Sequence, residues 1–256
     1  MIERKMKRMT RLLAAFGMSL CLVAAACAGN TDTNEVTVLA ASSLTGVFES
    51  LGESFERENP NDSVRFSFAG SSELVAQVQQ GVPADVIATA DEETMAQLTQ
   101  ADLLEGQPQM IALNELTIVV EAGNPENIQG LTDLDRKDLK IVLAAEQVPA
   151  GKYSRQVLDS VNVMVQPKSL EEDVKAVLTK VSLGEADAGI VYVTDVQAAG
   201  SAIGSVPIPD EQNVTARYMI GVLKEAPNPE SAGTFFDLVL SEHGARALIQ
   251  AGFRTP

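Results

Sequence analysis

The sequence predicts an α/β fold in which mostly parallel sheets carry helices on both faces. Short apolar runs typical of buried strands alternate along the chain with segments whose apolar residues recur at helical spacing. No segment repeats at a period of about 20 to 50 residues, so a solenoid is excluded. Hydrophobic residues make up 45% of the 256 positions, which is enough for a sizeable core.

Each element follows in order from this apolar pattern. The first strand, VTVLAA, is apolar except for Thr37, and the helix after it repeats apolar residues three or four positions apart from Leu44 to Phe55. Ser71 begins the next helix, because its hydroxyl suits a helix cap. The predicted strands cover residues 36–41, 64–68, 85–89, 116–120, 141–144, 188–193 and 217–223. The predicted helices cover residues 44–55, 71–80, 92–100, 151–160, 171–183 and 231–249.

The first 26 residues have the features of a cleaved export signal. Five basic residues precede an apolar run, Leu12 to Ala26, that is shorter than the roughly 20 residues of a membrane-spanning helix. Three alanines precede Cys27, a pattern that resembles a bacterial lipoprotein signal, in which the cysteine is lipidated and becomes the N-terminus. An ordinary signal cut after Ala26 or Ala28 is the alternative. Residues 27–35 are polar and are predicted to form a flexible tether to the cell membrane.

The charge balance argues against nucleic acid as a partner. The chain carries 19 Lys and Arg against 35 Asp and Glu, a formal charge of -16. Removal of residues 1–26 takes away five basic residues and one acidic residue, which leaves 14 against 34 and a mature charge of -20. A nucleic-acid-binding surface is basic instead.

Few residues with strong chemical reactivity are present. His243 is the one histidine, and Cys27 is the one cysteine after the signal, so a zinc site and a disulfide framework are both disfavoured. Aromatic residues make up 4% of the chain and Trp is absent, which weighs against recognition by ring stacking. The composition indicates a soluble, acidic protein without an obvious catalytic site.

Three loops that lead into predicted helices are candidates for an anion site. They are Ala41–Leu44, Ala69–Ser72 and Val148–Gly151. Each offers backbone N–H groups that lack a partner within the helix, and a helix N-terminus carries about half a positive charge. Two loops add serine hydroxyls, and none has Lys or Arg at its apex, so a shared site would be neutral. Ser-rich loops also serve as simple caps, and whether the three loops converge is not visible in the sequence.

Other chemistries have weaker support. The chain lacks the G-x-S-x-G elbow of serine hydrolases, and its one candidate base, His243, is predicted to lie on a solvated helix. An exported hydrolase that acts through Ser43 or Ser71 is nevertheless kept as the alternative from a different class. The acidic run 171–173 is interpreted as a complement to a helix dipole rather than a metal arm. A ferric-iron binder would favour paired tyrosines, and the chain has three tyrosines in all.

Five segments, taken in their order along the chain, resemble one family. They are VTVLAASSLTGVF, FAGSSELVAQVQQGVPADVIATAD, QVPAGKYSRQVL, EEDVKAVL and GIVYVTD. Together they resemble the molybdate-binding proteins of bacterial ABC transporters over residues 35–253. The segment PADVIATAD is shared with related oxyanion binders, whereas VPAG, EEDV and IVYVTD narrow the resemblance to molybdate and tungstate. The resemblance implies an extracytoplasmic receptor, not an enzyme, that delivers molybdate or tungstate to a permease and its ATPase.

The resemblance also implies five ligand residues: Ser43, Ser71, Ala150, Val174 and Tyr192. Both serines would each supply a hydroxyl and a backbone N–H, the alanine and the valine would supply backbone N–H groups, and the tyrosine would supply its phenol. Molybdenum would be held only as molybdate at these residues, without any other metal or cofactor.

The family fold implied by the resemblance has two α/β lobes around a cleft, as in periplasmic binding proteins. Lobe I would comprise residues 36–114 and 209–256 and hold both serines, and lobe II would comprise residues 115–208 and hold the other three ligand residues. Closure of the lobes would assemble the site in a monomer. The chain departs from the family pattern at Ser42, where the family often has Ala, and at Gly70, where it often has Ser, and both could adjust the shape of a loop.

A site built only of donors suits some oxyanions better than others. Molybdate, tungstate and sulfate are fully deprotonated at neutral pH, whereas phosphate retains a proton that such a site would leave unpaired, at a cost of about 1–3 kcal/mol. Sulfate has the same charge as molybdate, and only the size of the cavity can reject it. A binding protein for sulfate or another tetrahedral oxyanion is therefore the alternative within the same class.

Overall fold

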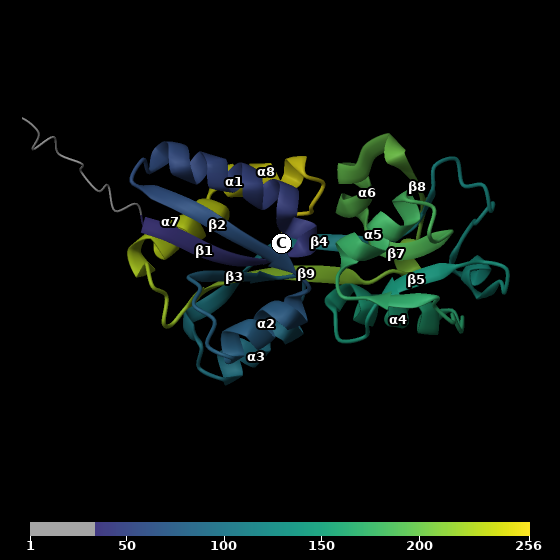
Figure 1. The fold of residues 1–256 in the computed structure, drawn as a ribbon, viewed down its shortest axis with the longest axis horizontal. Helices are drawn as coiled ribbons and strands as arrows, with labels where there is room; N and C mark the ends of the chain where they lie inside the picture. Colours follow the sequence, from purple (N-terminus) through teal and green to yellow (C-terminus); the bar gives the residue numbers. More distant parts are fainter. Residues whose placement is uncertain (1–33) are drawn as a thin grey trace, which may run out of the picture. The chain divides into compact units, whose positions relative to one another are not determined.

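A nine-stranded sheet organises residues 34–256, the part of the chain that the computed structural model describes (Figure 1). The predicted export signal and Cys27 lie outside the described residues. The strands are β1 (Asn34–Ala41), β2 (Asp62–Ala69), β3 (Val86–Thr89), β4 (Leu104–Glu121), β5 (Ile141–Ala144), β6 (Ser169–Glu171), β7 (Ala188–Tyr192), β8 (Ile203–Pro207) and β9 (Thr215–Leu223). The helices are α1 (Thr45–Glu58), α2 (Ser71–Gln79), α3 (Glu92–Gln100), α4 (Pro149–Ser160), α5 (Val174–Ser182), α6 (Val193–Ala199), α7 (Pro229–Leu240) and α8 (Glu242–Gln250).

The sheet combines parallel and antiparallel pairs. Strand β1 pairs in parallel with β2 and β3, and β5 pairs in parallel with β6 and β7. The predicted parallel pairing therefore holds for these strands, which helices connect. Strands β4 and β9 are antiparallel to their neighbours β3, β7 and β8 and to each other.

Strand β4 joins the two groups of parallel strands. Its first part, from Leu104 to Glu115, pairs with β9, and its last part, from Leu116 to Glu121, pairs with β7 and β8. In Figure 1, β4 and β9 run between the strands β1–β3 and the strands β5–β8. The lobe boundaries inferred from the sequence stay a prediction, but the change of partner shows how one strand can serve both groups.

The structure confirms the predicted strands and adds to them. Strands β6 and β8 and helix α6 were not predicted, and β1 begins at Asn34, two residues inside the predicted tether. The predicted strand at 116–120 is only the end of β4. The earlier part of β4 contains Gly106, at a φ of 70°, and its register with β9 shifts twice, which hides the strand in the sequence.

Two predicted helices have different limits. The prediction of one helix over 231–249 is wrong, because Ser241 is extended and its side chain accepts a hydrogen bond from the N–H of Gly244, which ends α7 and begins α8. The helix predicted from residue 171 begins at Val174. Asp173 caps it through the N–H of Ala176, and Glu171 belongs to β6.

A cluster of aromatic rings packs α1 against β2 and α7. The rings of Phe48, Phe55 and Phe66 lie within 6.1 Å of the ring of Phe235, in edge-on or tilted arrangements. Pairs of this kind add roughly 0.5–1.5 kcal/mol to the burial of the rings. The start of α1, next to the serine-rich loop at 42–44, is therefore anchored to a rigid core.

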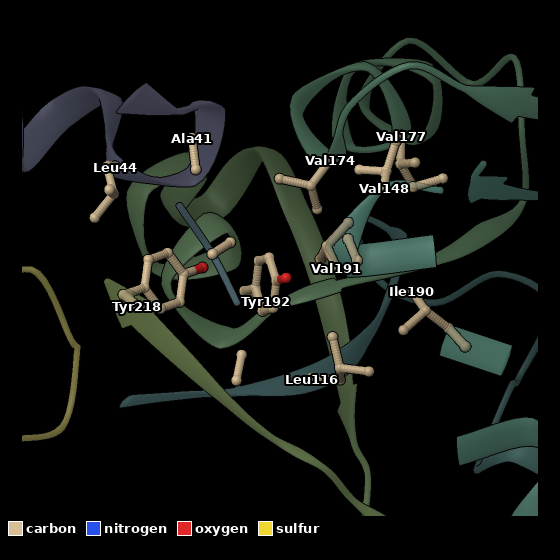
Figure 2. Packing of buried hydrophobic residues seen from close by; sticks show 14 of the residues in the cluster. Ala41, Leu44, Leu116, Val148, Val174, Val177, Ile190, Val191, Tyr192 and Tyr218 are labelled. Atoms are coloured by element: carbon tan, nitrogen blue, oxygen red, sulfur yellow. The ribbon is translucent and has the colours of Figure 1, made fainter. Parts of the chain in front are cut away.

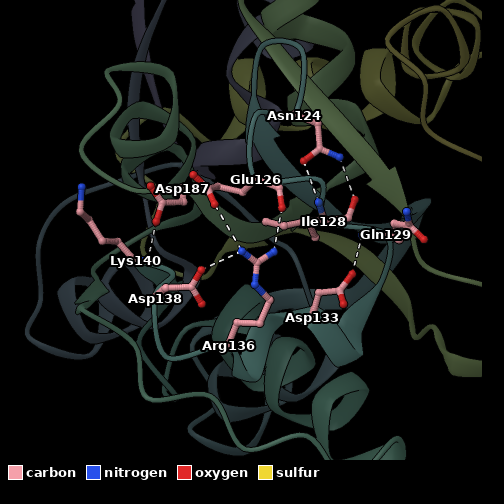
Figure 3. Close-up of polar contacts among 9 residues, drawn as sticks. All are labelled: Asn124, Glu126, Ile128, Gln129, Asp133, Arg136, Asp138, Lys140 and Asp187. Atoms are coloured by element: carbon pink, nitrogen blue, oxygen red, sulfur yellow. Dashed lines mark hydrogen bonds and ion pairs between the residues drawn. The ribbon is translucent and has the colours of Figure 1, made fainter.

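The connection between β4 and β5 is held by its own polar contacts (Figure 3). Arg136 donates to the backbone oxygen of Glu126 and to the carboxylate of Asp138, and Asn124 exchanges two hydrogen bonds with the backbone of Ile128.

Within residues 34–256, no helix combines the length and the apolar character needed to cross a bilayer.

Candidate functional site

The five predicted ligand residues line one small cavity. It lies beyond the carboxyl ends of β1, β2, β3 and β7, where ligands bind in open α/β sheets. The lining residues are Ala41, Ser42, Ser43, Ala69, Gly70, Ser71, Ala90, Val148, Pro149, Ala150, Val174 and Tyr192. No charged side chain is among them, as the sequence of the loops led us to expect. The structure thus supplies the convergence that the sequence left open.

The Ser71 hydroxyl is oriented by a neighbour that the sequence did not reveal. Ser71 is 1% exposed and begins α2, and its Oγ accepts a hydrogen bond from the backbone N–H of Ala90 at 3.0 Å. Since this bond uses an oxygen lone pair, the hydroxyl hydrogen remains available for an acceptor in the cavity. Ala90 follows β3, so the strand that neighbours β1 positions the hydroxyl at the end of β2.

Ser43 lies in the short 3₁₀ turn between β1 and α1. Its hydroxyl is 2.8 Å from the hydroxyl of Tyr218 on β9, and both groups are buried. The carboxyl end of β1 therefore holds a serine whose oxygen already has one partner inside the protein.

Two helices point uncapped N-termini at the cavity. The N-cap residues of α2 and α4 are Gly70 and Val148, and neither forms a side-chain cap. By contrast, Asp91 caps α3. A capping oxygen would occupy the first N–H groups of a helix, so its absence at α2 and α4 leaves those groups to a ligand. The resulting partial positive charge compensates for the absence of Lys and Arg in the lining.

Tyr192 contributes a phenol that has no partner within the described residues. The residue is 1% exposed, and its hydroxyl is buried without a hydrogen bond. Burial raises the pKa of the phenol well above 10, and the nearby Tyr218 raises it further. The group stays protonated and can donate. Figure 2 shows the two tyrosine rings side by side, with centroids 5.8 Å apart. A buried donor that lacks a partner costs about 1–3 kcal/mol, which an anion in the cavity would recover.

Contacts across the cavity bring its two sides together. The Ser72 hydroxyl donates to the backbone oxygen of Gln147, and Lys152 on α4 pairs with Glu93 on α3. A Cβ on Gly70 would lie 2.5 Å from the backbone oxygen of Glu172, closer than such atoms approach. Glycine at position 70 therefore permits a close approach of the two sides.

Asp195 supports Tyr192 from below. Its Oδ2 accepts a hydrogen bond from the backbone N–H of Tyr192 at 3.1 Å, and its Oδ1 is buried without a partner among the described residues. Burial raises the pKa of Asp195 to about 7, although the charge of Lys175 and the bond from Tyr192 act in the opposite direction. The carboxyl lines a second cavity, of about 200 Å³, on the other side of Ser43.

We expect this carboxyl to make the stability of the unliganded protein depend on pH. The folded protein holds a proton that the unfolded chain releases between pH 4 and pH 7, so the contribution is complete below about pH 4 and is lost as pH rises through 7. Between pH 5 and 7 the difference in unfolding free energy between wild type and Asp195→Asn should fall by about 1.4 kcal/mol per pH unit. Urea unfolding at a series of pH values measures this difference. Plots of unfolding free energy against pH that run parallel for the two proteins would contradict the prediction.

The structure gives the alternative chemistries no support. Within residues 34–256, Ser43 and Ser71 bond to Tyr218 and to a backbone N–H, not to a base, and His243 is exposed on α8. The same residues contain no group of three His, Cys, Asp or Glu side chains suited to a metal ion. Glu171 pairs with Lys180 at 2.7 Å; burial alone would raise its pKa, but hydrogen bonds from Lys180 and Ser169 lower it overall.

The family of the chain follows from a comparison with known families. The profile described as "Bacterial extracellular solute-binding protein" matches residues 36–254. The chain belongs to this family. A bacterial extracellular solute-binding protein works outside the cytoplasm, and the uncharged cavity among helix N-termini is suited to holding a solute.

Individual relatives of this solute-binding protein agree with the assignment. The molybdate-binding protein ModA of Mycobacterium tuberculosis is 40% identical over 230 residues, which cover 90% of this chain and 88% of the relative. The periplasmic molybdate-binding protein of Azotobacter vinelandii has a TM-score of 0.75 at 20% identity, over 86% of this chain and 99% of that one. The sulfate-binding protein SubI of M. tuberculosis has a TM-score of 0.76 at 20% identity, over 87% of both chains.

These comparisons confirm the predicted fold class. At 20% identity the two structures bear on the fold alone, and one is named for molybdate and the other for sulfate. The fold of this solute-binding protein therefore does not choose the anion, and the choice must come from the residues that line the cavity and from those that orient them.

Proposed function

We propose that this protein captures molybdate or tungstate outside the cytoplasm and delivers it to an ABC permease with its ATPase. The observation that carries the proposal is the donor set of the cavity. It comprises the hydroxyls of Ser43, Ser71 and Tyr192, the N–H groups at the uncapped starts of α2 and α4, and the N–H of Val174, since Asp173 caps α5 through the N–H of Ala176. The 40% identity to a relative named as a molybdate-binding protein supports the same reading.

The donor set matches a dianion that carries no hydrogen. Hydrogen bonds to a charged acceptor contribute roughly 1.5–3 kcal/mol each, so several of them can hold a dianion without a cationic side chain. The Ser71 oxygen already accepts from the N–H of Ala90, and the Ser43 oxygen lies against the Tyr218 hydroxyl. A hydrogen on the anion would compete with the serine hydroxyl hydrogens, which a fully deprotonated anion accepts without competition. We propose that Ala150 and Val174 bind through their backbone N–H groups, since their side chains are apolar.

The mature charge of -20 bears on how the anion arrives. Long-range attraction does not assist capture, and screening over roughly 8 Å at physiological salt limits the repulsion. Local dipoles at the helix N-termini therefore have to provide the binding energy. No cofactor and no catalysis are needed for this role, and we propose that the protein acts as a monomer.

A thermal-shift panel with molybdate, tungstate, sulfate and phosphate tests the proposal. A ligand at 100 times its Kd adds about 2.7 kcal/mol to the stability of the protein that binds it. We expect molybdate or tungstate to raise the melting temperature at micromolar concentrations and phosphate to leave it unchanged. Equal shifts with phosphate, or no shift with either metal oxyanion, would refute the proposal, and a shift with sulfate alone would replace it with the sulfate alternative.

We also propose that a lipid on Cys27 anchors the protein to the cell membrane. The three alanines before Cys27 and the polar residues after it support an anchor with a tether, and each buried CH₂ of a lipid adds about 0.8 kcal/mol. Cell fractionation tests this proposal: wild type should sediment with membranes, and Cys27→Ser should not. Recovery of both proteins in the soluble fraction would exclude the anchor.

A further inference from the structure

A buried hydrogen-bond network connects strands β4 and β9 to the Ser43 hydroxyl. Asn114 on β4 donates through Nδ2 to the Thr194 hydroxyl at 2.8 Å and to the Tyr218 hydroxyl at 3.4 Å. The Tyr218 hydroxyl is 2.8 Å from the Ser43 hydroxyl. These four residues come from β4, α6, β9 and the turn after β1, and each is at most 9% exposed.

Asn114 determines which groups donate and which accept in this hydrogen-bond network. Its Oδ1 accepts a hydrogen bond from the backbone N–H of Glu115 at 3.0 Å, so its amide nitrogen must face Tyr218. An amide nitrogen only donates, and the Tyr218 oxygen therefore accepts. Within residues 34–256, the phenolic hydrogen then has one acceptor at hydrogen-bond distance, the Ser43 oxygen.

The opposite direction would carry a penalty. If Ser43 donated to Tyr218, the phenolic hydrogen would be buried without an acceptor, because Asn114 presents hydrogens to it. Burial raises the pKa of Tyr218 far above its ordinary value, so the phenol cannot avoid this by ionising. With Tyr218 donating to Ser43, the serine hydrogen has no partner among these four residues and is free to donate to an anion in the cavity that Ser43 lines.

We propose that Asn114 and Tyr218 are positioning residues that fix Ser43 as a hydrogen-bond donor and thereby exclude anions that carry a hydrogen. This inference rests on the proposed function and assigns its selectivity to two residues outside the cavity lining. Ser71 is fixed in the same sense by the N–H of Ala90. Both serines therefore present a hydroxyl hydrogen to the ligand and disfavour a protonated tetrahedral anion for the same reason, through different partners.

The substitution Asn114→Asp should exchange donors and acceptors along the hydrogen bonds from residue 114 through Tyr218 to Ser43. A carboxylate keeps the bond from the Glu115 N–H but accepts from Tyr218 and Thr194, and these donors favour its ionised form. Tyr218 then accepts from Ser43, and Ser43 accepts from the ligand. We expect the affinity for molybdate, relative to hydrogen arsenate, to fall by about tenfold or more.

The comparison uses two anions of equal charge. At mildly alkaline pH, molybdate and hydrogen arsenate are both dianions, but only hydrogen arsenate carries a hydrogen, so the ratio of their affinities cancels the effect of the added negative charge. Asn213→Asp is the matched control, because Asn213 bonds to Leu116 on β4 and to Ile208 but not to the hydrogen-bond network of Ser43. We expect competition calorimetry to give Asn213→Asp the same ratio of molybdate affinity to hydrogen arsenate affinity as wild type.

The outcomes separate the inference from the proposed function. Wild type that binds molybdate, together with an unchanged ratio in Asn114→Asp, would overturn the inference alone. Wild type that binds no tetrahedral oxyanion would overturn the proposed function. Neutron diffraction from wild-type crystals tests the inference without any variant: a deuterium bonded to the Tyr218 oxygen and directed at Ser43 supports it, and one bonded to Ser43 and directed at Tyr218 overturns it.

Discussion

Replacing Ser71 by alanine should lower the affinity for molybdate by about a hundredfold. The change removes a hydrogen bond to a charged acceptor, which contributes roughly 1.5–3 kcal/mol, and each 1.4 kcal/mol corresponds to a factor of ten. It also leaves the buried N–H of Ala90 without its partner. Ser43→Ala should lower the affinity by about tenfold, because Ser43 is the more exposed of the two. Isothermal titration calorimetry measures both.

His243→Ala is the control for these variants. His243 is exposed on α8 and lies outside the cavity lining, so its removal should leave the affinity unchanged. Melting of each unliganded variant separates a loss of binding from a loss of folding. Wild-type affinity for molybdate in both serine variants would show that the cavity is not the binding site.

Replacing Gly151 by alanine should destabilise the protein itself. Gly151 is the third residue of α4, and a Cβ there would lie 2.0 Å from the backbone oxygen of Ala145 and 2.4 Å from that of Ala144. Neither atom is part of a flexible side chain, so β5 and α4 would have to separate. We expect a loss of about 3 kcal/mol of unfolding free energy, or a melting temperature lower by roughly 6–12 °C.

Binding should suffer as well, because Gly151 directly follows Ala150 at the start of the same helix. Separation of α4 from β5 would move the uncapped N–H groups away from the cavity. Gly233→Ala is the matched control: Gly233 lies within α7, where a Cβ would meet nothing within 4 Å, and the higher helix propensity of alanine should raise stability by up to about 1 kcal/mol. Equal melting of Gly151→Ala and wild type would contradict the packing argument.

Secondary structure was predictable where a local pattern dominates. The last part of β1 and the strands β3 and β7 are mostly apolar and buried, and an apolar run between turn residues has few other conformations open to it. The first part of β4 was not predicted, because shifts of register with β9 break the alternation of its side chains. The break between α7 and α8 escaped because Ser241 could equally have continued one long helix.

The residues that line the cavity were predictable from short motifs, whereas the residues that hold them in place were not. Ser43, Ser71, Ala150, Val174 and Tyr192 were named from short motifs that resemble a known family, and the structure brings all five around one cavity. Asn114, Tyr218 and Asp195 were missed. Tyr218 bonds to a residue 175 positions away and Asn114 to one 80 positions away, and no local pattern records such a pairing.

By itself, then, the sequence determined the α/β class, the serine-rich loops, the neutral character of the site and the acidic charge, because each depends on residue types in short segments. The tertiary structure decided that the loops meet, that Gly70 and Gly151 touch backbone across gaps too narrow for a side chain, and that the Tyr192 phenol lacks a partner. It also supplied the buried partners from which we infer the direction of the Ser43 hydrogen bond. A hydrogen bond takes its direction from the partner, and the partners of this serine come from strands that are distant in the sequence and adjacent only in the folded sheet.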